Sequence, residues 1–181
     1  MKKKEEEIKA LLQNEETAQR GFSIAVGEYS EQLYWQIRRM VTDHDDANDV
    51  LQNTFMKAWV NLGSFRGEAK LSTWLYRIAI NECLSFLNKR KMDGLVSIDE
   101  DSYETQCLEG ESFFDGDEAQ RLLQDAVESL PPKQRVVFAM KYFEERKYEE
   151  MSELLGTSVG ALKASFHHAV RKIEQYIEER D

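Results

Sequence analysis

The 181-residue sequence contains few of the residues that build sheets, secreted frameworks or membrane spans. It has nine glycines and two prolines, fewer turn residues than a β-sandwich or barrel needs. Its two cysteines, Cys83 and Cys107, form neither a disulfide framework nor a C-x-x-C pair, which favours a reducing, intracellular location. No run of about 18 apolar residues is present, so a transmembrane helix is not expected. Long stretches with helical spacing instead predict an all-α fold.

The net charge of −10 arises from one segment. Ten acidic residues and no Lys or Arg lie between Asp93 and Glu118, and the rest of the chain carries 24 basic and 24 acidic residues. The acidic total therefore does not argue against nucleic-acid binding. The segment lacks a helical or strand period, which is typical of a linker. The expected organisation is a charged N-terminal extension (1–21), a helical domain (22–92), an acidic linker (93–116) and a second helical domain (117–181).

Three helical patterns lie within the first 62 residues. Lys and Glu at helical spacing over residues 1–20 predict a solvated helix or a frayed tail. Apolar residues predict a helix over 22–40 and another over 42–62, with Thr42 and Asp43 as capping residues. Opposite its core face, the latter helix combines polar and apolar side chains: Asp49, Gln52, Asn53, Met56 and Val60. This face either packs against a neighbouring helix or docks a partner, and the sequence leaves both explanations open.

A further helix, expected over residues 70–90, carries a Trp beside basic and amide side chains. Residues 66–91 contain six basic and two acidic side chains, so this surface is locally positive. Cations hold phosphates, aromatic rings stack on unpaired bases, and amides bond to base edges. Trp74 alone is equally well explained as a core residue, but the basic run and the loop before the helix favour single-stranded DNA as its partner. The candidate residues are Phe65, Arg66, Trp74, Arg77, Asn81, Lys89 and Arg90.

The C-terminal domain is predicted to contain a helix-turn-helix. Its four expected helices cover residues 117–129, 132–142, 147–155 and 159–177. Gly156 suits the C-terminal stop of the third helix, and Thr157 and Ser158 suit the cap of the fourth. Apolar spacing alone would fit an ordinary helical hairpin, but the turn, the caps and the basic outer face together favour binding in the DNA major groove. The candidate residues are Ser158, Gly160, Lys163, Ala164, His167, His168 and Arg171.

No group of residues indicates a catalytic or metal site. His167 and His168 are adjacent on a helix and point about 100° apart, so they are poor joint metal ligands. A metal-dependent phosphohydrolase using His44 and Asp45 would need further ligands from other helices. Neither a Gly-rich phosphate loop nor a nucleophile–base pair is present. We therefore expect no enzymatic activity, no metal and no cofactor.

Several stretches resemble segments of the sigma-70 family of initiation factors, in particular its small extracytoplasmic-function group. Residues 45–59, DDANDVLQNTFMKAW, resemble the polymerase-binding segment. FRG at 65–67 and STWLYRIAIN at 72–81 resemble the promoter-melting segment. LPPKQR at 130–135 and residues 148–163 resemble the domain that binds the upstream promoter element. The motifs occur in the expected order along the chain.

The resemblance implies a two-domain subunit that joins the core of bacterial RNA polymerase and directs it to promoters. Asp49, Gln52, Asn53 and Met56 would dock on a coiled coil of the largest polymerase subunit. The loop and helix around Trp74 would engage the −10 element and capture a flipped base of the melted non-template strand, and the last helix would enter the major groove at the −35 element. The implied setting is the bacterial cytoplasm without membrane insertion, and the existence of an anti-sigma partner stays open.

The chain departs from the family pattern in the last helix. The family commonly has Thr-Val-Lys-Ser-Arg-Leu after the turn glycine, where this sequence has ALKASF at 161–166, and His168 replaces a later Arg. Contact at the −35 element is therefore expected to vary with pH near the ordinary His pKa of about 6.5. An ordinary helix-turn-helix regulator would explain the C-terminal domain alone, without the polar-apolar face around Met56 or the face around Trp74.

Overall fold

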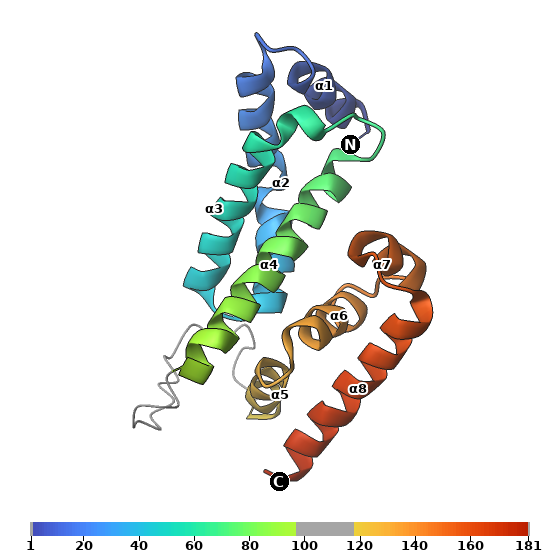
Figure 1. Cartoon of the computed structure of the whole chain (residues 1–181). Helices are drawn as coiled ribbons and strands as arrows, with labels where there is room; N and C mark the ends of the chain where they lie inside the picture. The colour runs from blue at the N-terminus through green and yellow to red at the C-terminus, as the bar shows by residue number, and fades with distance from the viewer. Residues whose placement is uncertain (1, 97–117, 181) are drawn as a thin grey trace.

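A computed structural model describes residues 2–96 and 118–180, and every regular element within them is helical (Figure 1). The N-terminal part contains α1 (Lys2–Leu12), α2 (Ala18–Val41), α3 (His44–Val60), the 3₁₀ helix η1 (Leu62–Ser64) and α4 (Leu71–Val96). The C-terminal part contains α5 (Glu118–Glu128), α6 (Pro132–Tyr142), α7 (Tyr148–Leu155) and α8 (Val159–Glu178). The predicted all-α fold is confirmed. None of these helices is long and apolar enough to cross a bilayer.

The caps predicted at Asp43, Gly156 and Ser158 are confirmed, but Thr42 ends α2 in a left-handed conformation, with φ +65°, and does not cap α3. The Asp43 side chain accepts a hydrogen bond from the Asp46 backbone N–H at 3.0 Å and caps α3. Gly156 ends α7 with φ +61°, a left-handed conformation that favours glycine. The segment predicted as an acidic linker mostly lies outside the described residues, as does Cys107. Residues 93–96 instead continue α4, because Gly94 keeps a helical backbone there.

α1 is a packed helix, so the expectation of a solvated helix or frayed tail is wrong. Ile8 and Leu12 are buried against the rest of the N-terminal part. A Cβ added to Gly21 would lie 2.7 Å from the Cβ of Leu11, so the missing side chain lets α1 approach α2 closely. The Thr17 hydroxyl donates to the Leu11 carbonyl at 2.8 Å. The many Lys and Glu residues of α1 conceal this short apolar face.

One hydrophobic core crosses from the N-terminal to the C-terminal part. Helix α6 packs against α4 and α2 (Figure 1). Its buried Val136 and Met140 belong to the same cluster as Ile80 and Leu87 of α4. A second cluster lies within the C-terminal part and contains Ala126, Val127, Leu130, Phe138, Ala169 and Ile173. The two helical groups are therefore packed against each other, although sequence patterns indicate only their separate cores.

Candidate functional site

The mixed polar and apolar face of α3 is exposed. Its inner face is buried through Ala47, Phe55 and Ala58, which turns the opposite face outward. There Met56 is 61 % exposed and Val60 is 80 % exposed, and Asp49, Gln52 and Asn53 are exposed beside them. Among the described helices none covers this face, so packing within the described residues does not explain its apolar side chains. We call Asp49, Gln52, Asn53, Met56 and Val60 the α3 face.

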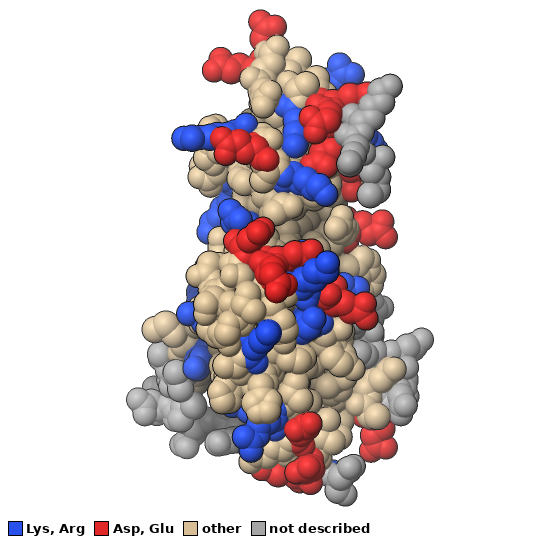
Figure 2. Space-filling view, turned by 90° about the vertical axis from the view of Figure 1, so that its right-hand side faces the viewer, with Lys and Arg blue, Asp and Glu red and all other residues tan. Residues whose placement is uncertain are grey.

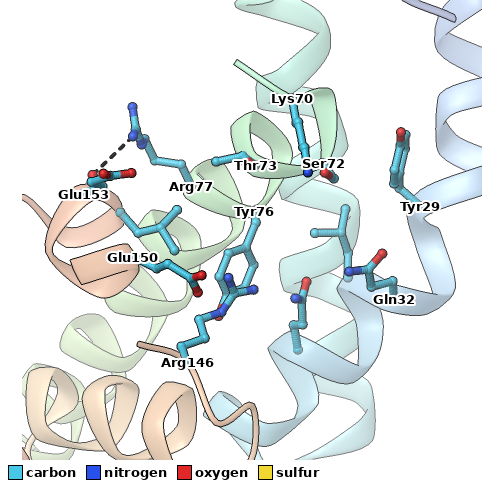
Figure 3. Close-up of a pocket in the computed structure, with 13 residues that line it drawn as sticks. Tyr29, Gln32, Lys70, Ser72, Thr73, Tyr76, Arg77, Arg146, Glu150 and Glu153 are labelled. Atoms are coloured by element: carbon cyan, nitrogen blue, oxygen red, sulfur yellow. Dashed lines mark hydrogen bonds between the residues drawn. The ribbon is translucent and has the colours of Figure 1, made fainter. Parts of the chain in front are cut away.

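The candidate residues around α4 are not equally accessible. Arg66, Arg77, Asn81, Lys89 and Arg90 are exposed, whereas Phe65 is buried and Trp74 is half-buried. The Arg77 Nη2 donates to the Glu153 carbonyl of α7 at 3.2 Å (Figure 3). Nη1 of Arg90 lies 2.6 Å from Oδ2 of Asp46, so this arginine holds the end of α4 against α3.

Phe65 and Trp74 form an aromatic pair at the start of α4. η1 turns the chain inward at this point, and the Phe65 N–H donates to the Leu62 carbonyl at 3.0 Å. Phe65 is only 8 % exposed, and its ring centroid lies 5.0 Å from that of the half-buried Trp74. In this conformation the Phe65 ring therefore packs against Trp74 on its buried side and is not presented to solvent.

Helix α8 presents the candidate residues of the helix-turn-helix on one side. Ser158 is the N-cap, and its hydroxyl accepts from the Ala161 N–H at 3.3 Å. Leu162 is buried on the inner side and fixes the rotation of the helix. The outward residues, all exposed, are Gly160, Lys163, Ala164, His167, His168 and Arg171. Figure 2 views the side of the molecule where α7 and α8 lie, and acidic and basic side chains are interspersed over it.

The Lys163 ammonium lies 5.7 Å from the centroid of the Tyr148 ring, a cation–π contact between the two helices of the motif. The rings of His167 and His168 are 6.2 Å apart. In the described part of the chain no group of three or more His, Cys, Asp or Glu side chains is placed to hold a metal ion.

A polar cluster joins α4 to the segment between α6 and α7, and sequence patterns did not indicate it. The Tyr76 hydroxyl donates to the Glu144 carboxylate, with its oxygen 2.8 Å from Oε1, and the Arg146 Nε donates to Oε2 at 2.6 Å. The Arg146 guanidinium also lies 4.2 Å from the centre of the Tyr76 ring (Figure 3). Burial, assisted by the Glu144 charge, raises the pKa of Tyr76 well above its usual value, so the phenol remains a donor.

Arg135 is a second buried polar group between the two parts. It is 8 % exposed, and its Nη2 donates to the Thr42 hydroxyl at 2.8 Å. Burial lowers the pKa of Arg135 to about 10. An arginine between the proline pair and the apolar run VVFAM is the available sequence signal, but only the packing of α6 against α4 shows that its charge is buried.

A cavity of about 500 Å³ lies beside this cluster, between α2, the start of α4, and α7. Of its basic lining residues, Lys70 and Arg77 come from around the start of α4 and Arg146 from the segment before α7, and Glu150 and Glu153 come from α7 (Figure 3). The first helix of the helix-turn-helix thus lies next to the aromatic and basic surface of α4. We call this packing of the C-terminal helices against α2 and α4 the closed arrangement. In it the Arg77 guanidinium is hydrogen-bonded to α7.

The sequence matches two protein families in order. Residues 25–92 match Sigma-70 region 2, and residues 120–173 match Sigma-70, region 4. The chain is 31 % identical over 176 residues to the ECF RNA polymerase sigma factor SigW of Bacillus subtilis (strain 168), with 91 % of this chain and 94 % of that protein covered. It is 30 % identical over 178 residues to the RNA polymerase sigma-H factor of Pseudomonas aeruginosa, covering 88 % and 87 %.

Solved structures share the fold. A co-crystal structure of the sigma factor RpoE with the anti-sigma factor NepR from Bartonella quintana superposes with a TM-score of 0.64 at 24 % identity, over 87 % of this chain and 96 % of that chain. The structure of CnrH in complex with the cytosolic domain of CnrY superposes with a TM-score of 0.61 at 21 % identity, over 90 % and 91 %.

Proposed function

The chain belongs to the extracytoplasmic-function group of the sigma-70 family, and from this membership we propose which of its surfaces carries each part of sigma-factor activity. It is an RNA polymerase sigma factor, which binds the polymerase core and directs promoter recognition, DNA melting and the initiation of transcription. We assign RNA synthesis to the core enzyme and no catalytic residue, metal or cofactor to this chain. It would act beside polymerase in the bacterial cytoplasm.

The α3 face is the proposed docking surface for the polymerase core. The observation that supports it is the exposure of Met56 and Val60 beside Asp49 and Gln52, with no described helix over them. An apolar centre with polar neighbours is the composition expected of a protein interface. A coiled coil of the largest polymerase subunit is the proposed partner.

The surface of α4 and the preceding loop is proposed to bind the melted −10 element. Trp74 supplies a ring for an unpaired base, and the exposed amide of Asn81 can bond to a base edge. Phe65 takes part by supporting Trp74. The proposed cationic contacts to the strand are Arg66, Arg77, Lys89 and Arg90.

Helix α8 is proposed to bind the −35 element in the major groove. Ser158, Gly160 and Ala164 keep the first turns small, so that the helix can approach base edges. Lys163, His167, His168 and Arg171 then reach bases or phosphates. These assignments correspond to functional units over 22–92 and 117–181, joined by 93–116, although α4 itself extends to Val96.

An anti-sigma factor is a further proposed partner. The similar solved structures include a sigma factor bound to an anti-sigma factor. Because α7 and α4 already contact each other here, a protein that stabilises this arrangement would keep Arg77 engaged.

Binding of the full chain to purified bacterial RNA polymerase core tests the assignment of the α3 face. We expect Asp49→Ala/Gln52→Ala to weaken binding by about tenfold or more, since truncating interface residues that carry binding energy costs over 1 kcal/mol. Gln19→Ala/Ser23→Ala is the control, because it removes two exposed polar side chains from α2. Equal affinity of both double variants and the wild type would contradict the assignment. Binding of duplex DNA without core would instead indicate an ordinary regulator.

A further inference from the structure

α1 and the first turn of α4 meet at a carboxylate, and we propose that this contact positions the −10 loop, defined as residues 65–70. The inference rests on the proposed function of that loop and α4. Oε1 of Glu5 accepts a hydrogen bond from the Leu71 backbone N–H at 2.7 Å, across 66 residues of sequence. We assign Glu5 as a positioning residue, which acts through α4 and does not itself touch DNA.

The residue before α4 cannot cap the helix with its side chain. Lys70 precedes the helix, and an ammonium cannot accept a hydrogen bond. No acidic residue lies in the first turn of α4 either. The N–H groups of a first helical turn need acceptors, and a carboxylate also suits the positive end of the helix dipole. Glu5 supplies both features from another helix.

The segment that follows α1 also contacts the −10 loop. Gly67 has φ +75°, and a Cβ at this position would lie 2.9 Å from Nε2 of Gln13. On the inner side of the loop, the Phe65 ring packs against Trp74 at an angle of 42°. The loop is therefore held between the N-terminal segment and the aromatic pair, with Glu5 fixing the helix that follows it.

α1 is anchored firmly enough to serve as this support. Ile8 and Leu12 are buried, and Lys4 forms an ion pair with Glu28 of α2. Glu5 also faces Tyr29 of α2, where burial and the Glu5 charge together raise the pKa of the phenol. The Glu5 carboxylate thus lies close to α2 while it bonds to the start of α4.

Loss of the Glu5 carboxylate would free the Leu71 N–H and let the first turn of α4 fray. Trp74 and Thr73 lie within that turn and the next, so both would lose their fixed position relative to an unpaired strand. Recognition of a base requires side chains to be held within about 0.5 Å. Glu5→Ala should therefore reduce base selection at the −10 element and leave the α3 face unchanged.

Amide hydrogen exchange of the free full-length chain tests the contact directly. Glu5→Ala is compared with Glu7→Ala, which removes the same charge from an exposed position of α1, and with Glu5→Gln, which keeps an acceptor oxygen. We expect exchange at Leu71 to be about tenfold or more faster in Glu5→Ala, since a hydrogen bond to a charged group is lost. Glu5→Gln should be intermediate and Glu7→Ala unchanged. Unchanged exchange at Leu71 in Glu5→Ala would overturn the proposal.

Base selection by the reconstituted holoenzyme tests the consequence. Each variant, bound to polymerase core, selects from promoter DNA with a pre-melted −10 region of random sequence. Glu5→Ala should lower the preference for the favoured −10 bases by about tenfold, and Glu7→Ala should match the wild type. If Glu5→Ala keeps the wild-type preference for the −10 bases, then Glu5 only stabilises α4, and the inference is overturned. Failure of every chain, wild type included, to bind core would instead overturn the proposed function, while the exchange measurement still reports on Glu5.

Discussion

Gly156 and Gly160 lie four residues apart where α7 gives way to α8, and the same substitution should have opposite effects on them. Gly156→Ala places a Cβ at φ +61° and should lower the free energy of unfolding by about 1 kcal/mol. Gly160→Ala lies in a helix, with nothing within 4 Å of the new Cβ, and should raise it by about 0.5–1 kcal/mol. Urea denaturation of both variants measures the difference. Two shifts of the same sign would contradict this explanation.

Single residues also show the limit of sequence analysis. The exposure of Met56 follows from its place opposite the core face of α3, so helical periodicity was sufficient to predict it. Phe65 precedes α4 in an irregular loop, where no periodicity indicates which way a ring points. Its burial on Trp74 depends on η1 and on the adjacent N-terminal segment. The sequence therefore indicated both rings as candidate DNA contacts, but neither their contact with each other nor the separate role of each ring.

At the scale of the helix, capping is the local interaction that sequence predicts best. Asp43→Ala removes the hydrogen bond to the Asp46 N–H and should lower the free energy of unfolding by about 1 kcal/mol. Lys147 occupies the same position before α7 but makes no side-chain capping bond, so Lys147→Ala is the matched control. Thermal or urea unfolding followed by circular dichroism measures both. An equal loss in the two variants would exclude capping as the cause.

Most helices were predicted within a few residues, because caps and apolar spacing act locally, although α4 continues six residues beyond its expected end at Arg90. α1 was the exception. Its apolar contacts with α2 depend on Gly21, because a side chain at that position would keep the two helices apart. A missing side chain gives no periodic signal. The sequence therefore predicted that α1 is exposed to solvent, whereas in the structure it packs against α2.

At the scale of the whole molecule, contacts between distant helices were beyond sequence analysis. Tyr76 occupies an apolar position of α4, and Glu144 lies in a turn 68 residues later. Neither residue has a local pattern that indicates the other. The packing of α6 on α4 brings them together, and it also engages Arg77 with α7.

Tyr76→Phe should loosen the closed arrangement. The substitution leaves the Glu144 carboxylate, whose side chain is 6 % exposed, with one donor fewer at a cost of about 1–3 kcal/mol. Small-angle X-ray scattering of the free chain should show a larger radius of gyration. Tyr142→Phe is the control, since that tyrosine is 54 % exposed. A radius unchanged by Tyr76→Phe would contradict a role of this bond in closure.

The same tyrosine gives closure a dependence on pH. The pKa of Tyr76 is raised in the closed form, so its stabilising contribution is present below about pH 10, the ordinary pKa of the phenol, and is lost as the pH rises through the raised value. The wild type should therefore expand at alkaline pH through Tyr76. The variant lacking the phenol should lose that component of the expansion.

The charge of Arg135 would change its environment if the C-terminal helices separated from α2 and α4 to give an open form. While α6 lies on α4, this guanidinium bonds to Thr42 and is hidden from solvent. Once the two parts separate, this guanidinium, which is already charged while it is buried, becomes hydrated and can pair with a phosphate. A polyanion should therefore bind the open form more tightly than the closed form. Added salt screens this attraction, so it should shift the equilibrium back towards the closed form.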